Sequence, residues 1–203
     1  MSKKLLGWVI VIAVIAILGI WMKNGYNAMV VAQENVENAW GQVQTSYQHR
    51  ADLVPQLVGV VQGVAEQEQA VIVGAMEARA KATSVNIDPS NMTEEQLKNF
   101  QQVQGDLSQA MNRLMVAVER YPEIKSNANF SQLQSQLEGI ANRITVARKA
   151  FNDEAKVYNT LIRKFPNNLV AMMFSFERKP YFEAEAGAEK APEVKFDFNK
   201  KAN

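Results

Sequence analysis

Few residues in this chain have the types and spacing that chemistry requires. The 203 residues contain no cysteine and a single histidine, His49, so a histidine-based catalytic triad would depend wholly on that one ring. Di-iron helical bundles bind metal through Glu-x-x-His pairs, and the residue three positions before His49 is Ser46 rather than glutamate. We therefore expect no catalytic residue, no metal site and no cofactor, and we expect that the protein is not an enzyme.

Arg50 and Asp52 are the charged residues that most suggest a role, because they stand just before Pro55 in an otherwise helical pattern. Two residues apart, they do not face each other on a helix. They could form a docking point. The structural alternative, which we favour, pairs Arg50 with an acidic group on another helix and has Asp52 capping a helix that begins at Leu53.

Two aromatic–proline pairs, Tyr121-Pro122 and Phe165-Pro166, each end a helical pattern. The simpler interpretation is structural, since the ring covers the end of a bundle and the proline prevents the helix from continuing. The alternative is a ligand-binding rim that both pairs share at one end of the bundle.

An apolar run near the N-terminus determines where the rest of the chain lies relative to a membrane. Residues 5–22 contain no charge, and Trp8 and Trp21 lie near its two ends. A helix of this length measures about 27 Å, close to the hydrocarbon core of a bilayer at about 30 Å. Indole rings favour the membrane–water interface. The sequence therefore predicts a membrane-spanning helix.

A cleaved signal peptide is the alternative to a retained anchor. Signal peptides have shorter apolar regions and end at small residues, whereas this run ends in Trp21 and Met22. We favour the anchor. Lys3 and Lys4 precede it and Lys23 follows, which favours a cytoplasmic N-terminus and an exported body.

The charge of the remaining chain argues against nucleic-acid binding. The whole chain carries a formal net charge of +1, and without the three lysines that flank the apolar run this becomes −2. Nucleic-acid-binding proteins instead carry a clustered basic face. Only 10 glycines and 6 prolines occur, which is consistent with long helices.

Beyond the anchor, apolar residues recur with a period near 3.5, which predicts helices that pack along one another. The first pattern covers residues 26–82, where Pro55 either kinks the helix near Ala51 or divides it in two. Residues 83–91 read as a loop, and Thr93 to Gln96 match a capping box. A second helix follows and ends at Pro122.

The third helix has the most regular apolar stripe, from Leu133 to Phe165, and stops at Pro166. Residues 167–176 predict a short apolar cap on the bundle. Residues 183–203 combine low hydrophobicity with mixed charge, which predicts a disordered tail. The predicted fold is all-α: a single N-terminal transmembrane helix followed by a long antiparallel, coiled-coil-like bundle of three to four helices.

A series of motifs on these helices resembles the LemA family of bacterial membrane proteins. The motifs are Tyr26-Asn27, Trp40 through Tyr47, Arg50 through Val58, Glu77 through Ala80, Tyr121-Pro122, Ala147 through Asn152, Tyr158-Asn159 and Phe165-Pro166. One departure is Phe151, where the family commonly has tyrosine. The loop 84–91 and the tail 187–196 resemble those of Bacteroidetes-type members. The resemblance implies a single-pass anchor, a long helical bundle and no established catalytic activity.

These observations divide the chain into an anchor (residues 1–25), a LemA-like bundle (26–182) and a tail (183–203). They predict a non-enzymatic membrane scaffold that self-associates or docks another membrane or envelope protein. The alternative is a small-molecule sensor or enzyme with a pocket at the bundle end. The candidate interaction or structural residues are Arg50, Asp52, Pro55, Tyr121, Pro122, Arg148, Asn152, Tyr158, Asn159, Phe165 and Pro166, and those of the anchor are Leu5, Trp8, Trp21 and Met22.

Overall fold

The computed structural model describes residues 3–62 and 68–183, and it confirms the all-α prediction because these residues contain helices and no strand. The helices are α1 (Lys3–Gln62), α2 (Gln69–Ser84), the 3-10 turn η2 (Pro89–Asn91), α3 (Glu94–Val118), α4 (Pro122–Lys125), α5 (Ala128–Arg163) and α6 (Asn167–Met173). The predicted disordered tail lies outside the described residues, apart from Glu183.

The helix α1 has 60 residues and is therefore about 90 Å long. Its N-terminal third extends beyond the rest of the molecule, and its apolar residues there are exposed. This part of the helix is long and apolar enough to cross a membrane, with a mean hydropathy of 2.7 over an 18-residue window of which no residue is buried. It carries the anchor residues Leu5 and Trp8.

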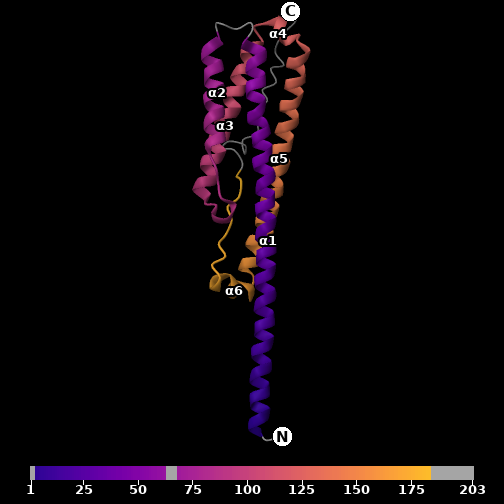
Figure 1. Cartoon of the computed structure of the whole chain (residues 1–203), viewed down its shortest axis with the longest axis vertical. Helices are drawn as coiled ribbons and strands as arrows, with labels where there is room; N and C mark the ends of the chain where they lie inside the picture. Colours follow the sequence, from indigo (N-terminus) through magenta and orange to yellow (C-terminus); the bar gives the residue numbers. More distant parts are fainter. Residues whose placement is uncertain (1–2, 63–67, 184–203) are drawn as a thin grey trace, which may run out of the picture.

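The remaining two thirds of α1 form the central element of an antiparallel bundle. The helix α5 runs antiparallel along one side of α1, and the α2–α3 hairpin packs on its far half (Figure 1). The apolar stripe of α1 faces these helices, since Val36, Trp40 and Val43 are almost completely buried. A stripe with a period near 3.5 is what such lengthwise packing requires, which confirms the predicted bundle.

Two apolar clusters fill the bundle. The one nearer the apolar end of α1 surrounds Trp40, whose ring lies 5.2 Å from Phe100 on α3 and 5.6 Å from Phe151 on α5. The second, farther along, contains Leu57 from α1 and Leu107 from α3. We call them the proximal core and the distal core.

Residues 174–183, which we call the strap, follow α6 without forming a helix. The strap runs back along the bundle as the yellow trace in Figure 1. Its Phe182 is buried in the proximal core, with its ring stacked 6.1 Å from that of Trp40. An extended segment therefore completes a core that the apolar periodicity had assigned to helices alone.

The structure corrects several predicted boundaries. The first helical pattern does not extend to Ala82 as one helix, because α1 ends at Gln62 and α2 begins at Gln69. Pro55 does not divide α1, which remains helical on both sides of it. The capping box is confirmed: the Thr93 hydroxyl accepts from the Gln96 amide at 3.2 Å, and the Gln96 side chain accepts from the Thr93 amide at 2.9 Å.

Candidate functional site

Two asparagines on α5 hold the strap in place. The Asn159 side chain donates to the Lys179 carbonyl at 2.8 Å and accepts from the Lys179 amide at 2.9 Å. Asn152 makes the same pair of bonds with Phe182, at 2.9 and 2.8 Å. Seven residues of helix rise about 10.5 Å, and three residues of extended chain span about 10 Å. The distance between the two asparagines on α5 therefore matches the distance between Lys179 and Phe182 on the strap, so one face of α5 binds the strap at two points.

Charged side chains add further contacts to the strap. The Arg148 guanidinium donates to the Glu183 carbonyl at 2.9 Å and lies 4.9 Å from the centre of the Phe182 ring. The Lys179 amino group donates to the Pro89 carbonyl at 2.8 Å and also to the Ser90 carbonyl. The strap therefore ties α5 to the loop that contains η2.

Burial also changes the acid–base behaviour of two of these groups. Burial lowers the pKa of the Lys179 amino group, although nearby carboxylates oppose this effect. Burial, with a smaller contribution from Glu177 and Glu37, raises the pKa of the neighbouring Tyr158 to about 12, so its phenol ionises less readily than that of an exposed tyrosine. General acid–base catalysis favours a pKa near neutrality, and the pKa of Tyr158 lies far above it.

A second polar group joins α1 to the α2–α3 hairpin. Arg50 donates to the Ser108 hydroxyl at 2.6 Å and to both the backbone and side-chain oxygens of Gln104 at 2.8 Å. The Gln104 side chain, which is buried, donates in turn to the Ala82 carbonyl at 3.2 Å. These bonds join Arg50 to neutral groups on α3, whereas the sequence had led us to expect an acidic partner on another helix.

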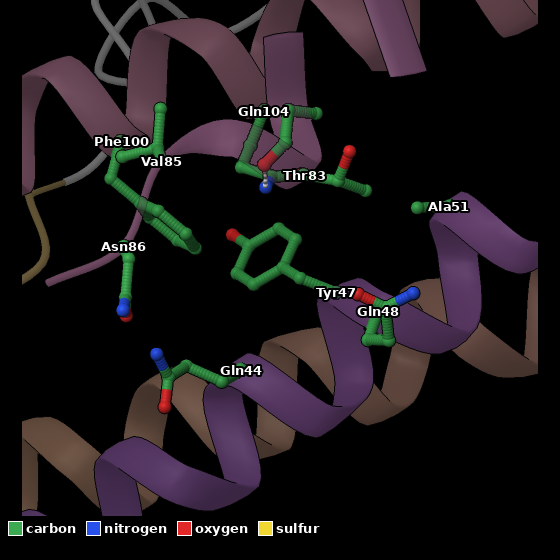
Figure 2. A pocket seen from close by; sticks show the side chains of 10 residues that line it. Gln44, Tyr47, Gln48, Ala51, Thr83, Val85, Asn86, Phe100 and Gln104 are labelled. Carbon is green, nitrogen blue, oxygen red and sulfur yellow. Dashed lines mark hydrogen bonds between the residues drawn. The ribbon is translucent and has the colours of Figure 1, made fainter. Parts of the chain in front are cut away.

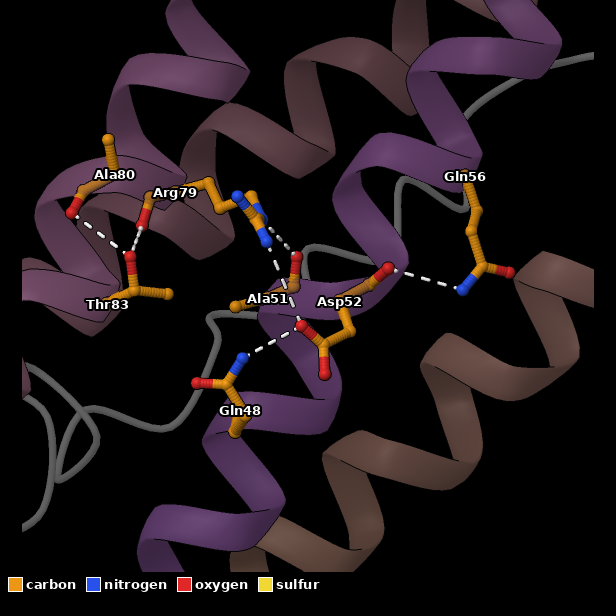
Figure 3. A network of polar contacts seen from close by, with 7 residues as sticks. All are labelled: Gln48, Ala51, Asp52, Gln56, Arg79, Ala80 and Thr83. Atoms are coloured by element: carbon orange, nitrogen blue, oxygen red, sulfur yellow. Dashed lines mark hydrogen bonds and ion pairs between the residues drawn. The ribbon is translucent and has the colours of Figure 1, made fainter.

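Pro55 is coupled to this region through the backbone. A proline has no amide hydrogen, so the carbonyl of Ala51, four residues earlier, has no helical donor. Arg79 on α2 supplies one, with its Nε 2.9 Å from the Ala51 oxygen (Figure 3). An arginine from another helix thus replaces the hydrogen bond that the proline removes.

Asp52 does not cap a helix, because α1 continues through it. Its carboxylate instead accepts from Gln48 at 2.8 Å and lies 3.8 Å from the Arg79 guanidinium, as Figure 3 shows. The Asp52 side chain is half exposed, and ion pairs at such positions contribute at most about 1 kcal/mol. Asp52 therefore braces Arg79 only weakly and remains accessible at the surface.

A pocket of about 260 Å³ lies beside these groups, between α1 and the α2–α3 hairpin. Tyr47 extends from α1 across it, and amide side chains surround the opening (Figure 2). Its lining residues are Gln44, Tyr47, Gln48, Ala51, Ala82, Thr83, Val85, Asn86, Phe100 and Gln104. The lining contains no carboxylate, amine or imidazole, so it offers hydrogen bonds but no acid–base pair.

The two aromatic–proline pairs do not form one site. Tyr121-Pro122 lies where α4 begins, beside the distal core, whereas Phe165-Pro166 lies between α5 and α6. The 36 residues of α5 separate them, and Figure 1 shows α4 and α6 at opposite ends of the bundle. The interpretation as a shared rim is therefore wrong. Pro122 also does not end α3, which stops at Val118.

The other candidate residues fall into two groups. Arg148, Asn152, Tyr158 and Asn159 lie along the strap, while Trp21 and Met22 are half-buried against the proximal core. Within the described part of the chain, no three His, Asp or Glu side chains are close enough together to hold a metal ion.

Sequence reasoning missed several residues that build these contacts, and they are Arg79, Gln104, Lys179 and Phe182. The seven-residue spacing of Asn152 and Asn159 was a signal for the strap, because two amides on one helix face must have partners when buried.

Comparisons with known proteins agree with the architecture. A family model described as the LemA family matches residues 39–196. The magnetosome protein MamQ of Magnetospirillum gryphiswaldense is 26% identical over 180 residues, which are 80% of this chain and 66% of that protein. Magnetosome protein MamQ 2 of Paramagnetospirillum magneticum is 33% identical over 79 residues, 39% of this chain and 29% of that protein. The chain thus covers less than two thirds of the length of these relatives.

Proposed function

Because the chain belongs to the LemA family, we propose that it is a non-enzymatic membrane scaffold whose bundle docks a second copy or another membrane or envelope protein. In this proposal α1 crosses the bacterial inner membrane with its N-terminus in the cytoplasm, and the bundle lies in the periplasm. The membrane-spanning helix and the proposed docking helix are the same continuous element.

The observation that carries the proposal is the continuity of α1 from its exposed apolar part into both cores. A bundle hung on a flexible linker would sample many orientations, whereas a continuous helix holds its surface at one height and angle to the membrane. A scaffold benefits from such pre-organisation, because less freedom is lost when a partner binds.

The polar residues of the bundle also support a structural rather than a catalytic role. Arg50, Arg79, Asn152 and Asn159 each bond to another element of the described chain. The pocket beside Tyr47 has no charged lining side chain with which to transfer a proton. The alternative of a sensor or enzyme at the bundle end loses its motivation, since the aromatic–proline pairs lie at opposite ends.

The docking surface that we propose is an open groove between α1 and α5. It measures about 530 Å³ and is lined by Asn38, Gly41, Gln42, Thr45, Ser46, His49, Ile140 and Arg143. On the α1 side, Gly41, Thr45 and Ser46 are small, which allows another helix to approach, and the neighbouring polar side chains can form hydrogen bonds with it. No atom lies within 4 Å of a Cβ built at Gly41, so the groove is open there.

The test is purification of the full-length protein from native membranes in mild detergent, followed by determination of the particle mass. We expect a homogeneous oligomer or a reproducible second protein. Gly41→Arg should abolish this association, because the arginine side chain would occupy the groove, while its Cβ would meet no atom within 4 Å.

Gly74→Arg on α2 is the matched control, since a Cβ at Gly74 also meets no atom within 4 Å. It should leave the association intact. A strict monomer without a partner would contradict the scaffold proposal, and equal effects of the two substitutions would contradict the choice of groove.

A further inference from the structure

The end of the bundle next to the apolar part of α1 carries an exposed apolar patch. We call it the foot, and its residues are Phe165, Leu169, Met172, Met173 and Phe174. Phe165 and Met172 are 81% and 80% exposed, respectively. Single exposed apolar residues are ordinary on protein surfaces, whereas a contiguous group of large ones marks an interaction site.

The foot lies where α1 passes from its exposed apolar segment into the bundle. A Cβ at Gly25 would lie 3.7 Å from Val170 of α6, and the Tyr26 ring is centred 4.8 Å from that of Phe174. One turn earlier, Trp21 is half-buried against the proximal core, while Ile20 is exposed. The foot is therefore level with the end of the segment that would occupy the hydrocarbon core.

After Asn167 and Asn168 at its start, both sides of α6 are apolar. Val170 and Ala171 are buried against the bundle, while Leu169, Met172 and Met173 lie on the outward side. A helix that is apolar all round is found in a protein core or in lipid. Since one side of α6 already faces the protein core, its other side matches a lipid environment.

Exposed cations lie next to the foot in the sequence. Arg163 and Lys164 directly precede Phe165, and Lys23 follows the apolar run of α1 two residues before Gly25, which lies beside α6. Basic residues beside a membrane-embedded segment interact favourably with anionic headgroups. An apolar patch with cations at its edge is the pattern of segments that lie in the membrane interface.

We propose that the foot inserts into the interface of the same membrane that α1 crosses, so that the bundle is attached to the bilayer at two points. The occupant is lipid rather than a second copy, because the patch lies beside the end of the exposed apolar segment of α1 and exposed cations adjoin it in the sequence. Two attachments would set the tilt of the bundle. The inference depends on α1 spanning the membrane, and it holds for either orientation and without any docked partner.

The chain contains no cysteine, so a single introduced cysteine can be labelled specifically to test the proposal. Met172→Cys in the full-length protein is labelled with an environment-sensitive fluorophore and reconstituted into vesicles of phosphatidylcholine and phosphatidylglycerol. Val146→Cys on α5, which is 68% exposed and distant from α6 in the sequence, is the matched control. Each sample is exposed to aqueous iodide and, separately, to lipids with a nitroxide on the acyl chain.

We expect the label at position 172 to lose most of its fluorescence to the nitroxide lipid and to be shielded from iodide, with the reverse at position 146. Quenching of position 172 by iodide alone would overturn the proposal. Protection of position 172 from both quenchers would also overturn it, in favour of coverage by a second copy. Failure of the docking groove would change neither result.

Discussion

At the scale of single residues, the two asparagines of α5 act as replacements for a neighbouring strand. An asparagine side chain carries one acceptor and one donor group, so it can satisfy both the amide and the carbonyl of one strap residue. Asn152 does this for Phe182 and Asn159 does it for Lys179. The strap thereby becomes ordered without entering any helix or sheet.

Asn159→Asp tests this interpretation with a change of nearly equal size. The carboxylate can still accept from the Lys179 amide, but it cannot donate to the Lys179 carbonyl, and it places a charge in a buried site. We expect the free energy of unfolding to fall by about 2–4 kcal/mol in chemical denaturation of the full-length protein in micelles.

Asn142→Asp is the matched control, because Asn142 is exposed on the same helix. Its effect should stay within about 0.5 kcal/mol. Similar losses for Asn159→Asp and Asn142→Asp would contradict the role assigned to Asn159.

Ser175, at the start of the strap, has a φ of 57°, a left-handed conformation that costs a residue with a Cβ about 1–2 kcal/mol. It lies directly after the C-cap of α6, and the Phe176 amide donates to the Ala171 carbonyl at 2.9 Å, as in a Schellman motif. Ser175→Gly should raise the free energy of unfolding by about 0.5–1 kcal/mol.

Ser126→Gly serves for comparison, since Ser126 caps α4 with an ordinary φ of −81°. Thermal unfolding of both variants should show a gain only at position 175. A gain at 126 equal to that at 175 would show that the backbone conformation is not the cause.

At the scale of elements, the positions of the helices were largely predictable from the sequence. The side-chain contacts between different helices were not. The apolar period identified the stripe of α5, and Thr93 marked the start of α3 to the residue. Pro55 was misleading for a physical reason. Its effect on α1 depends on Arg79, which lies 28 residues after Ala51, and local spacing cannot show that a side chain so distant supplies the missing hydrogen bond.

The coupling of Pro55 with Arg79 can be measured in a double-mutant cycle. With alanine at position 55, the helix regains its own donor for the Ala51 carbonyl, so Arg79 has less to contribute. We expect Arg79→Ala to lower the free energy of unfolding by about 1–2 kcal/mol in the native chain and by about half of that in Pro55→Ala.

Arg120→Ala combined with Pro55→Ala is the control cycle. Arg120 pairs with Glu68 at 2.8 Å and shares no partner with Pro55, so the two changes should add within about 0.5 kcal/mol. Strict additivity in the Arg79 cycle as well would refute the replacement of the helical hydrogen bond.

At the scale of the whole molecule, the exposed apolar part of α1 and the antiparallel bundle followed from apolar patterning, whereas the strap did not. The period of the apolar residues identifies long stripes that pack on neighbouring helices. The position of the strap depends instead on a few specific contacts of Phe182 and Lys179 and of the two α5 asparagines. For the same reason Arg50 and Asp52 could be located in the sequence, whereas their partners Gln104 and Arg79 could not be assigned.

The rod-like continuity of α1 predicts a distance that spectroscopy can measure. Spin labels at Asn27→Cys and Gly59→Cys are 32 residues apart on one helix and both positions are exposed, so we expect a single narrow distribution near 48 Å. The pair Asn27→Cys and His49→Cys, which does not span Pro55, should give about 33 Å. A short or broad distribution for the first pair alone would show that α1 breaks at Pro55.

The arrangement of the bundle also has a consequence for its synthesis. The helix α1, which contains Trp40, leaves the ribosome first. The aromatic residues that cover Trp40 follow much later: first Phe100, then Phe151 and finally Phe182. The distal hairpin of α2 and α3 can form early from nearby segments, but the proximal core must wait until the strap has emerged. Trp40 therefore stays exposed in the nascent chain until synthesis is nearly complete, and this is the interval in which aggregation must be prevented.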